Sequence, residues 1–194
     1  MKKFQPILFL GLLLMSSVAF SADWQIDNAA SQLSFISVKK THIAEVHQFE
    51  TLSGGVTDAG QITVEIDLNS VNTGIEIRDN RMREFLFDVV SFPTAIISGQ
   101  VELSFLDTLD IGQSAETSVD ATLSLHGETA SVALDMLVTK LSEQQLLVTS
   151  VKPVILNVTD FALVAGVEKL QELAGLPSIS LAVPVSFYLT LNAK

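Results

Sequence analysis

The sequence predicts a mainly β protein, an antiparallel sandwich or barrel that carries two short amphipathic helices. Three observations predict this fold class. Apolar and polar residues alternate along several segments, glycine-containing turn signals separate those segments, and two further segments repeat their apolar residues at helical spacing. A period of two is the pattern of a strand with one buried and one solvated face. About seven or eight such strands joined by turns are typical of an antiparallel sandwich or barrel.

The alternating rows define the expected strands. In the longest row, residues 181–191, every second residue is apolar. The other regular rows cover residues 62–68, 101–105, 119–125 and 132–138, and two less regular stretches, around Leu33 and Phe35 and over residues 147–156, are also expected to be strands. Turns are expected at residues 53–55, 58–60, 110–112 and 126–128, where glycine stands beside polar residues.

Two segments depart from the period of two and predict helices. Over residues 75–89 apolar residues recur at helical spacing, and Pro93 limits the helix because proline disfavours helical geometry in the residue before it. Over residues 166–176 an apolar stripe faces a charged one, and Gly175 and Pro177 form a typical helix end.

The first residues have the layout of a secretory signal peptide: Lys2 and Lys3, an apolar run over residues 6–20, and small residues at Ser21 and Ala22. The run spans about 15 residues, whereas a helix that crosses a bilayer needs about 20. We therefore expect residues 1–21 to be a signal peptide, cleaved after Ser21 or Ala22, and residues 22–194 to form one exported, periplasmic domain. An uncleaved N-terminal anchor is the alternative.

Composition excludes several function classes. Cysteine is absent and 48% of the residues are hydrophobic, so an apolar core rather than disulfides must stabilise the fold. Without Lys2 and Lys3, nine basic residues stand against 22 acidic ones, a charge that repels nucleic acids. Beyond the N-terminal run no apolar stretch is long enough for a membrane helix. One Trp and one Tyr are too few for the aromatic girdles of an outer-membrane barrel.

Four segments together carry a family resemblance: residues 24–35, which open on Trp-Gln-Ile-Asp; residues 66–73; residues 78–93, with their Arg-Asp, Met-Arg, Phe-Asp and Phe-Pro pairs; and residues 123–129, Leu-Ser-Leu-His-Gly-Glu-Thr. In order and spacing they resemble the YceI-like family over about residues 24–160. The resemblance implies an antiparallel, eight-stranded, lipocalin-like barrel in the periplasm that binds polyisoprenoids or related amphiphiles.

The chain also departs from the family pattern. Arg81 stands where the family usually has histidine, and His47 stands where it usually has glycine. The helix over residues 166–176 is not part of the general pattern. These departures indicate a divergent branch, with the extra helix as a possible additional lid.

We expect an exported lipid-binding protein that holds an isoprenoid or fatty-acyl amphiphile in an apolar barrel, for carriage or sequestration. The inward rows of Leu, Val, Ile and Phe suit such a tail. No nucleophile elbow or phosphate-binding glycine loop is present, so we predict no enzyme and no cofactor beyond a bound lipid. Two alternatives remain open: a hydrolase or isomerase acting on such an amphiphile, and a filled barrel that serves as a structural or interaction module.

Arg78, Arg81 and Arg83 concentrate positive charge in an acidic chain. One hypothesis is that one or more of them hold a phosphate or carboxylate head group, because arginine makes bidentate contacts with such groups. The alternative is that Arg78 and Arg83 form ordinary ion pairs with acidic neighbours in their own segment.

Most of the apolar candidates for the ligand site are phenylalanines. For each of them the alternative is that it packs in the hydrophobic core without contacting a ligand. Met82 and Phe85 are the strongest of them, since a helix that caps a barrel presents its apolar stripe inward. The candidate ligand-binding residues are Phe35, Phe49, Arg78, Arg81, Met82, Phe85, Phe87, Phe92 and Phe105.

The three histidines, His42, His47 and His126, are expected to be exposed loop residues, and no spacing among them predicts a metal site. A homodimer is an open possibility, with the long row over residues 181–191 pairing with a second copy at a sheet edge.

Overall fold

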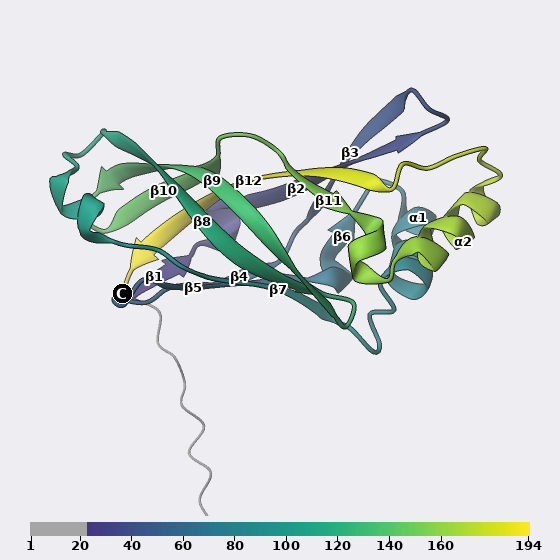
Figure 1. The fold of residues 1–194 in the computed structure, drawn as a ribbon, viewed down its shortest axis with the longest axis horizontal. Helices are drawn as coiled ribbons and strands as arrows, with labels where there is room; N and C mark the ends of the chain where they lie inside the picture. The colour runs from purple at the N-terminus through teal and green to yellow at the C-terminus, as the bar shows by residue number, and fades with distance from the viewer. Residues whose placement is uncertain (1–22) are drawn as a thin grey trace, which may run out of the picture.

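The computed structural model describes residues 23–194, which form an antiparallel barrel with helices covering one end (Figure 1). The predicted signal peptide of residues 1–21 lies outside the described residues. Within residues 23–194, no helix has the length and apolar character needed to cross a membrane.

Within these residues, eight strands form a closed ring. The ring closes because β1 pairs antiparallel with both β4 and β12, with Trp24 opposite Val56 on one side and Ala193 on the other. Closure removes the unpaired strand edges that an open sheet would present. The predicted eight-stranded barrel is therefore confirmed. In spatial order the ring strands are β1 (Trp24–Ile26), β4 (Leu52–Val56), β5 (Gln61–Asp67), β7 (Thr94–Gln100), β8 (Ser114–Leu125), β9 (Glu128–Ser142), β10 (Gln145–Ser150) and β12 (Ala182–Ala193).

Four further strands lengthen the wall at the helical end. After a short turn at Asn28–Ala30, β2 (Gln32–Lys39) succeeds β1 as the partner of β12, with Phe35 opposite Val185. β3 (Ile43–Phe49) pairs with β2 along its whole length, and their hairpin projects beyond the barrel (Figure 1). The others are β6 (Val71–Asn72), beside β3, and β11 (Val154–Asn157), beside β12.

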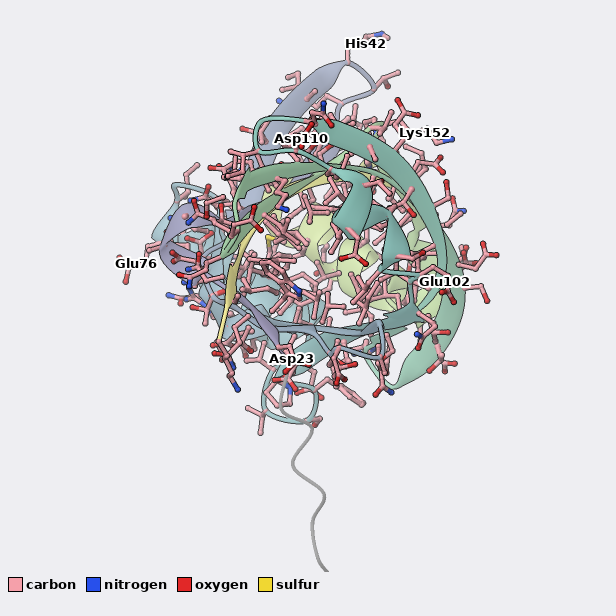
Figure 2. The ribbon with its side chains drawn as sticks, turned by 90° about the vertical axis from the view of Figure 1, so that its left-hand side faces the viewer. Asp23, His42, Glu76, Glu102, Asp110 and Lys152 are labelled. Atoms are coloured by element: carbon pink, nitrogen blue, oxygen red, sulfur yellow. The ribbon has the colours of Figure 1, made fainter. Side chains whose placement is uncertain are left out.

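The alternating rows place their apolar face inside the barrel. Ile62, Val64 and Ile66 of β5 are buried, as are Val119, Ala121 and Leu123 of β8. Figure 2 looks along the barrel from the end opposite the helices and shows His42, Glu76, Glu102 and Lys152 at the periphery. Water therefore meets the polar face of the strands, and the lumen is apolar.

Two local predictions from the rows are wrong. Residues 101–105 do not continue a strand: β7 ends at Gln100, and the turn η4 (Ser104–Thr108) folds over the barrel end opposite the helices. Residues 53–55 are not a turn but part of β4. Gly54 has φ +102°, and a Cβ there would lie 2.1 Å from the carbonyl oxygen of Thr63. The glycine permits close backbone approach between β4 and β5.

Both predicted helices are present, with different bounds. The first is α1 (Glu76–Arg81), continued by a π-helical turn, η3 (Met82–Leu86), so it ends before the expected residue 89. The second is α2 (Val164–Ala174), which follows the short turn η5 (Val158–Phe161) and ends at Gly175 with φ +60°. α2 packs against η3, and Figure 1 shows α1 and α2 together at one end of the barrel.

β12 lies inside the sheet rather than at an edge where a second copy could pair. It pairs with β10 and β11 on one side and with β1 and β2 on the other. Neighbouring strands of the same chain already use most backbone groups of β12, so this row offers a second copy no free edge.

Gly166 allows α2 to approach η3, and its replacement tests that contact. A Cβ at residue 166 would lie 2.6 Å from the carbonyl oxygen of Phe85 and 2.8 Å from Cα of Leu86. Alanine favours a helix over glycine by about 1 kcal/mol, yet we expect Gly166→Ala to lower the free energy of unfolding by about 1–3 kcal/mol through overpacking. Urea unfolding measures the change.

The matched control is Glu168→Ala, which changes an exposed residue of the same helix. Its free energy of unfolding should stay within about 0.5 kcal/mol of the wild-type value. A Gly166→Ala protein more stable than wild type would show that α2 and η3 separate without cost.

Candidate functional site

A cavity of about 410 Å³ occupies the helical end of the barrel. Its wall comes from inward residues of β2, β3, β5, β7, β8 and β12, and its roof from α1, η3, α2 and the segment after α2. Most of the lining side chains are apolar. The volume lies within the range of about 300–1,000 Å³ that is usual for small-molecule sites.

The helix predicted as an additional lid lies over this cavity. Val167 and Leu170 of α2 line it beside Met82 and Leu86 of η3. Two backbone hydrogen bonds fasten the segment after α2 to β2: the Lys40 N–H donates to the Ser178 carbonyl at 3.1 Å, and the Ser180 N–H donates to the Val38 carbonyl at 2.8 Å. The segment after α2 is thus bonded to the wall, while α2 itself packs against η3.

The inner face of β2 and β3 changes from apolar to charged along its length. Antiparallel pairing brings inward residues of the two strands opposite one another, and the period of two keeps them on the same face. All of them line the cavity. In order from the middle of the barrel outward they are Leu33 with Phe49, Phe35 with His47, Ser37 with Glu45, and then Lys39.

At the charged end two cations share one carboxylate. Lys39 Nζ lies 2.6 Å and Arg78 Nη1 2.9 Å from Glu45 Oε2. The hydrogen bond from Lys39, helped by the charge of Arg78, holds the pKa of Glu45 below its ordinary value despite partial burial. Arg78 also donates from Nε to Thr73 Oγ1 at 2.8 Å and from Nη2 to the Thr73 carbonyl at 2.7 Å. Its ion-pair partner is therefore on β3, and not in its own segment as the second alternative proposed.

Arg83 and Arg81 differ from Arg78 in their partners. Arg83 lies outside the cavity lining, where its Nε donates to the Asn69 carbonyl at 2.7 Å and its Nη2 to the Val71 carbonyl at 3.2 Å. Arg81 lines the cavity and is half-buried, and its Nη1 donates to the Leu173 carbonyl near the end of α2 at 3.3 Å. In the described part of the chain, neither arginine has a carboxylate ion-pair partner.

His47 is a wall residue and not an exposed loop residue, so the prediction for it is wrong. Its side chain is 3% exposed and its ring meets Phe35 edge-on, with ring centroids 5.3 Å apart. Its Nε2 shares a 2.9 Å hydrogen bond with Ser37 Oγ, while Nδ1 has no partner within residues 23–194. Burial, with a smaller contribution from the Arg78 charge, lowers the pKa of His47 below 6.5, so the imidazole is neutral at neutral pH.

The structure gathers six of the nine candidate residues around the cavity. Phe105 instead lines a second, wholly apolar cavity of about 90 Å³ at the other end of the barrel. Phe85 and Phe92 line neither cavity; Phe92 packs against His126 with ring centroids 4.6 Å apart. The six residues at the larger cavity are Phe35, Phe49, Arg78, Arg81, Met82 and Phe87.

The π-helical turn explains why Phe85 faces outward. In an α-helix Met82 and Phe85 would share a face. Here the Phe87 N–H donates to the Met82 carbonyl at 2.9 Å, an i to i+5 bond that widens the turn. Phe87 consequently joins Met82 and Leu86 at the cavity, and Phe85 is 37% exposed.

Several cavity residues were missed from sequence. Lys39, Glu45 and His47 continue the alternation that begins at Leu33 and Phe35, and extending that row through the following hairpin would have placed them on the inner face. These three residues were not predicted because they are polar, and only apolar residues were assigned to the inner face of the strands.

A family model for the YceI-like domain matches residues 24–191. The chain belongs to the YceI-like family. Its barrel resembles a polyisoprenoid-binding domain from Saccharophagus degradans implicated in plant cell wall breakdown, with a TM-score of 0.87 and 40% sequence identity over 90% of this chain and 100% of that one. A comparison with curated proteins gave no match.

Two more distant structures share the fold of this YceI-like chain. BcnA of Burkholderia cenocepacia has a TM-score of 0.65 and 16% identity over 85% of this chain and 98% of its own. A Campylobacter jejuni YceI protein has a TM-score of 0.57 and 15% identity, over 100% of this chain and 99% of its own.

The buried histidine makes stability depend on pH. The unfolded histidine titrates near 6.5, whereas folded His47 stays neutral to a lower pH. Between these two pKa values the unfolded state binds the proton first, so the free energy of unfolding falls as pH is lowered through this window and recovers above it. Glu45, with its lowered pKa, stays ionised there.

We therefore expect the wild type to lose more thermal stability than His47→Gln when the pH is lowered from about 7.5 to about 5. Melting temperatures of both proteins across this range measure the difference. His42→Gln, which changes the exposed histidine of the β2–β3 hairpin, is the control and should follow the wild type. Equal losses in wild type and His47→Gln would contradict the argument.

Proposed function

We propose that the chain is an exported lipid-binding protein that holds an isoprenoid or fatty-acyl amphiphile in its barrel, for carriage or sequestration. The observation that carries the proposal is the cavity of about 410 Å³, apolar through most of its lining and charged at one end. A tail placed there leaves water at a gain of about 25 cal/mol per Å² of apolar surface. The 40% identity to a domain described as polyisoprenoid-binding supports the same ligand class.

The wall gives the ligand one preferred orientation. The tail belongs beside Leu33, Phe35 and Phe49, where burial of apolar surface is favourable. A polar head belongs beside Lys39 and Arg81, since charged groups lose much of their hydration in an apolar interior. An amphiphile fits this division better than a wholly apolar or wholly polar molecule.

A hydrolase acting on such an amphiphile is favoured by one observation, the 2.9 Å hydrogen bond between Ser37 Oγ and His47 Nε2 at the cavity. A serine nucleophile needs a base that is itself oriented by a third group. Within residues 23–194 the other imidazole nitrogen, Nδ1, has no such partner. We therefore propose binding without catalysis.

Native mass spectrometry of the purified protein, followed by organic extraction, tests this function. We expect a stoichiometric adduct whose extracted mass is that of an isoprenoid or acyl lipid, because the cavity offers the tail a dry apolar surface. Delipidated protein offered such lipids should take them up again. Protein without an adduct and without uptake would overturn the proposal in favour of a structural or interaction module, and a ligand returned as cleaved product would favour the hydrolase.

Filling the cavity should displace the lipid without unfolding the barrel. Ile97 of β7 lines both cavities and thus borders empty space. We expect Ile97→Trp to lose most of the bound lipid in the same native spectra, while its free energy of unfolding changes by less than about 1.5 kcal/mol. Ser98→Trp, at the next and outward position of β7, is the control and should keep its lipid. Full lipid occupancy in Ile97→Trp would place the ligand elsewhere.

A further inference from the structure

We propose that Arg81 is the receptor for an anionic head group, and that it makes the cavity selective for amphiphiles ending in a phosphate or a carboxylate. The inference rests on the proposed function and deepens it by naming the ligand class. It depends on how the structure distributes the cations at the charged end of the cavity.

The charged end of the cavity is positive although the protein is acidic. Among the described residues, the charged side chains that line the cavity are Lys39, Glu45, Arg78 and Arg81, three cations and one carboxylate. The full chain carries a formal charge of −11. An anion is therefore attracted at this place, on a molecule whose remaining surface repels it.

The other two cations at this end are already engaged. Lys39 and Arg78 both lie against Glu45, and Arg78 also donates to Thr73 from two of its nitrogens. These contacts tie α1 to β3 and compensate the Glu45 charge. An anionic ligand would have to compete with a carboxylate for either side chain.

Among the three cations that line the cavity, Arg81 is the one without a carboxylate ion-pair partner within residues 23–194. It is half-buried and lines the cavity, and its one hydrogen bond there goes to a neutral carbonyl, that of Leu173, at 3.3 Å. A guanidinium has five N–H donors in a planar fork. Holding a partly desolvated cation without an anion is costly, and a phosphate or carboxylate would compensate it through charge-assisted, bidentate bonds.

The bond to Leu173 also orients the guanidinium. It joins the α1 side of the roof to the end of α2, where the unpaired carbonyls give the helix a partial negative charge. The donors that remain are available at the cavity, beside the position expected for a head group. A purely structural role for Arg81 would affect every ligand equally, whereas a receptor role affects only the anionic ones.

The experiment compares ligands that share a tail and differ in the head: farnesol with farnesyl monophosphate, and hexadecanol with palmitic acid. Dissociation constants are measured at about pH 7.5, where both acids are ionised, by displacement of a fluorescent lipid. We expect wild-type protein to bind the anionic member about tenfold to a hundredfold more tightly. The two pairs show whether phosphate or carboxylate is preferred.

In Arg81→Gln the preference for the anion should disappear while the affinity for the alcohols stays unchanged, and Arg81→Lys should retain part of it. Lys169→Gln is the matched control: it removes a cation from α2 outside the cavity lining and should keep the wild-type preference. A preference that survives in Arg81→Gln overturns the proposal, as does an equal loss for alcohols and anions, which marks a structural role.

Two further outcomes are distinguishable. Inorganic phosphate that binds wild-type protein as tightly as farnesyl monophosphate would assign Arg81 to a free anion and overturn the head-group role. Absence of binding for all four lipids in wild type would overturn the proposed function itself, rather than the role of Arg81 within it.

Discussion

Closure of the ring through β1 is the constraint on which the rest of the molecule depends. β1 spans Trp24–Ile26, yet it pairs with β4 on one side and with β12 on the other. A closed ring satisfies the backbone hydrogen bonds of its strands without filling the lumen. The barrel can consequently stay hollow at the helical end, where an open sheet would have to bury its inner face against another layer. The described chain contains no cysteine that could replace this closure with a disulfide.

The two ends of the barrel are covered by different elements, and only the helical end retains a cavity large enough for a small-molecule ligand. At one end Phe105 and Leu106 of η4 fold inward, and the remaining space is about 90 Å³ and wholly apolar. At the other end β2 and β3 extend the wall, and α2 closes over it from the side. α2 packs against η3, and the segment after α2 forms backbone hydrogen bonds at the end of β2. An amphiphile can present its tail to the lumen and its head to this end alone, since the charged lining residues among those described lie there.

The barrel could be predicted from the sequence because a strand with one buried face has apolar residues at every second position. Alternation over residues 119–125 and 132–138 located β8 and β9, and Gly127 located the turn between them. The same reasoning was wrong for residues 101–105 and 53–55. There an apolar row covers the barrel end instead of continuing a strand, and a glycine serves a close approach between strands instead of a turn. Both errors concern tertiary contacts that the local pattern does not encode.

The site was predicted less completely, for physical reasons that its residues make clear. Phe85 satisfies the helical period but faces outward, because a single i to i+5 bond at Phe87 changes the phase of the turn. His47 is polar yet buried, since Ser37 on the neighbouring strand offers it a hydrogen bond.

Three arginines within six residues have three different environments, and only the fold separates them. Arg78 forms an ion pair with Glu45, which is distant in sequence. Arg83 donates hydrogen bonds to the carbonyls of Asn69 and Val71. Arg81, the last residue of α1, lines the cavity and donates to the Leu173 carbonyl near the end of α2. A charge pattern in the sequence can indicate that cations gather, but which of them remains available to a ligand is decided by the partners that folding brings to the others.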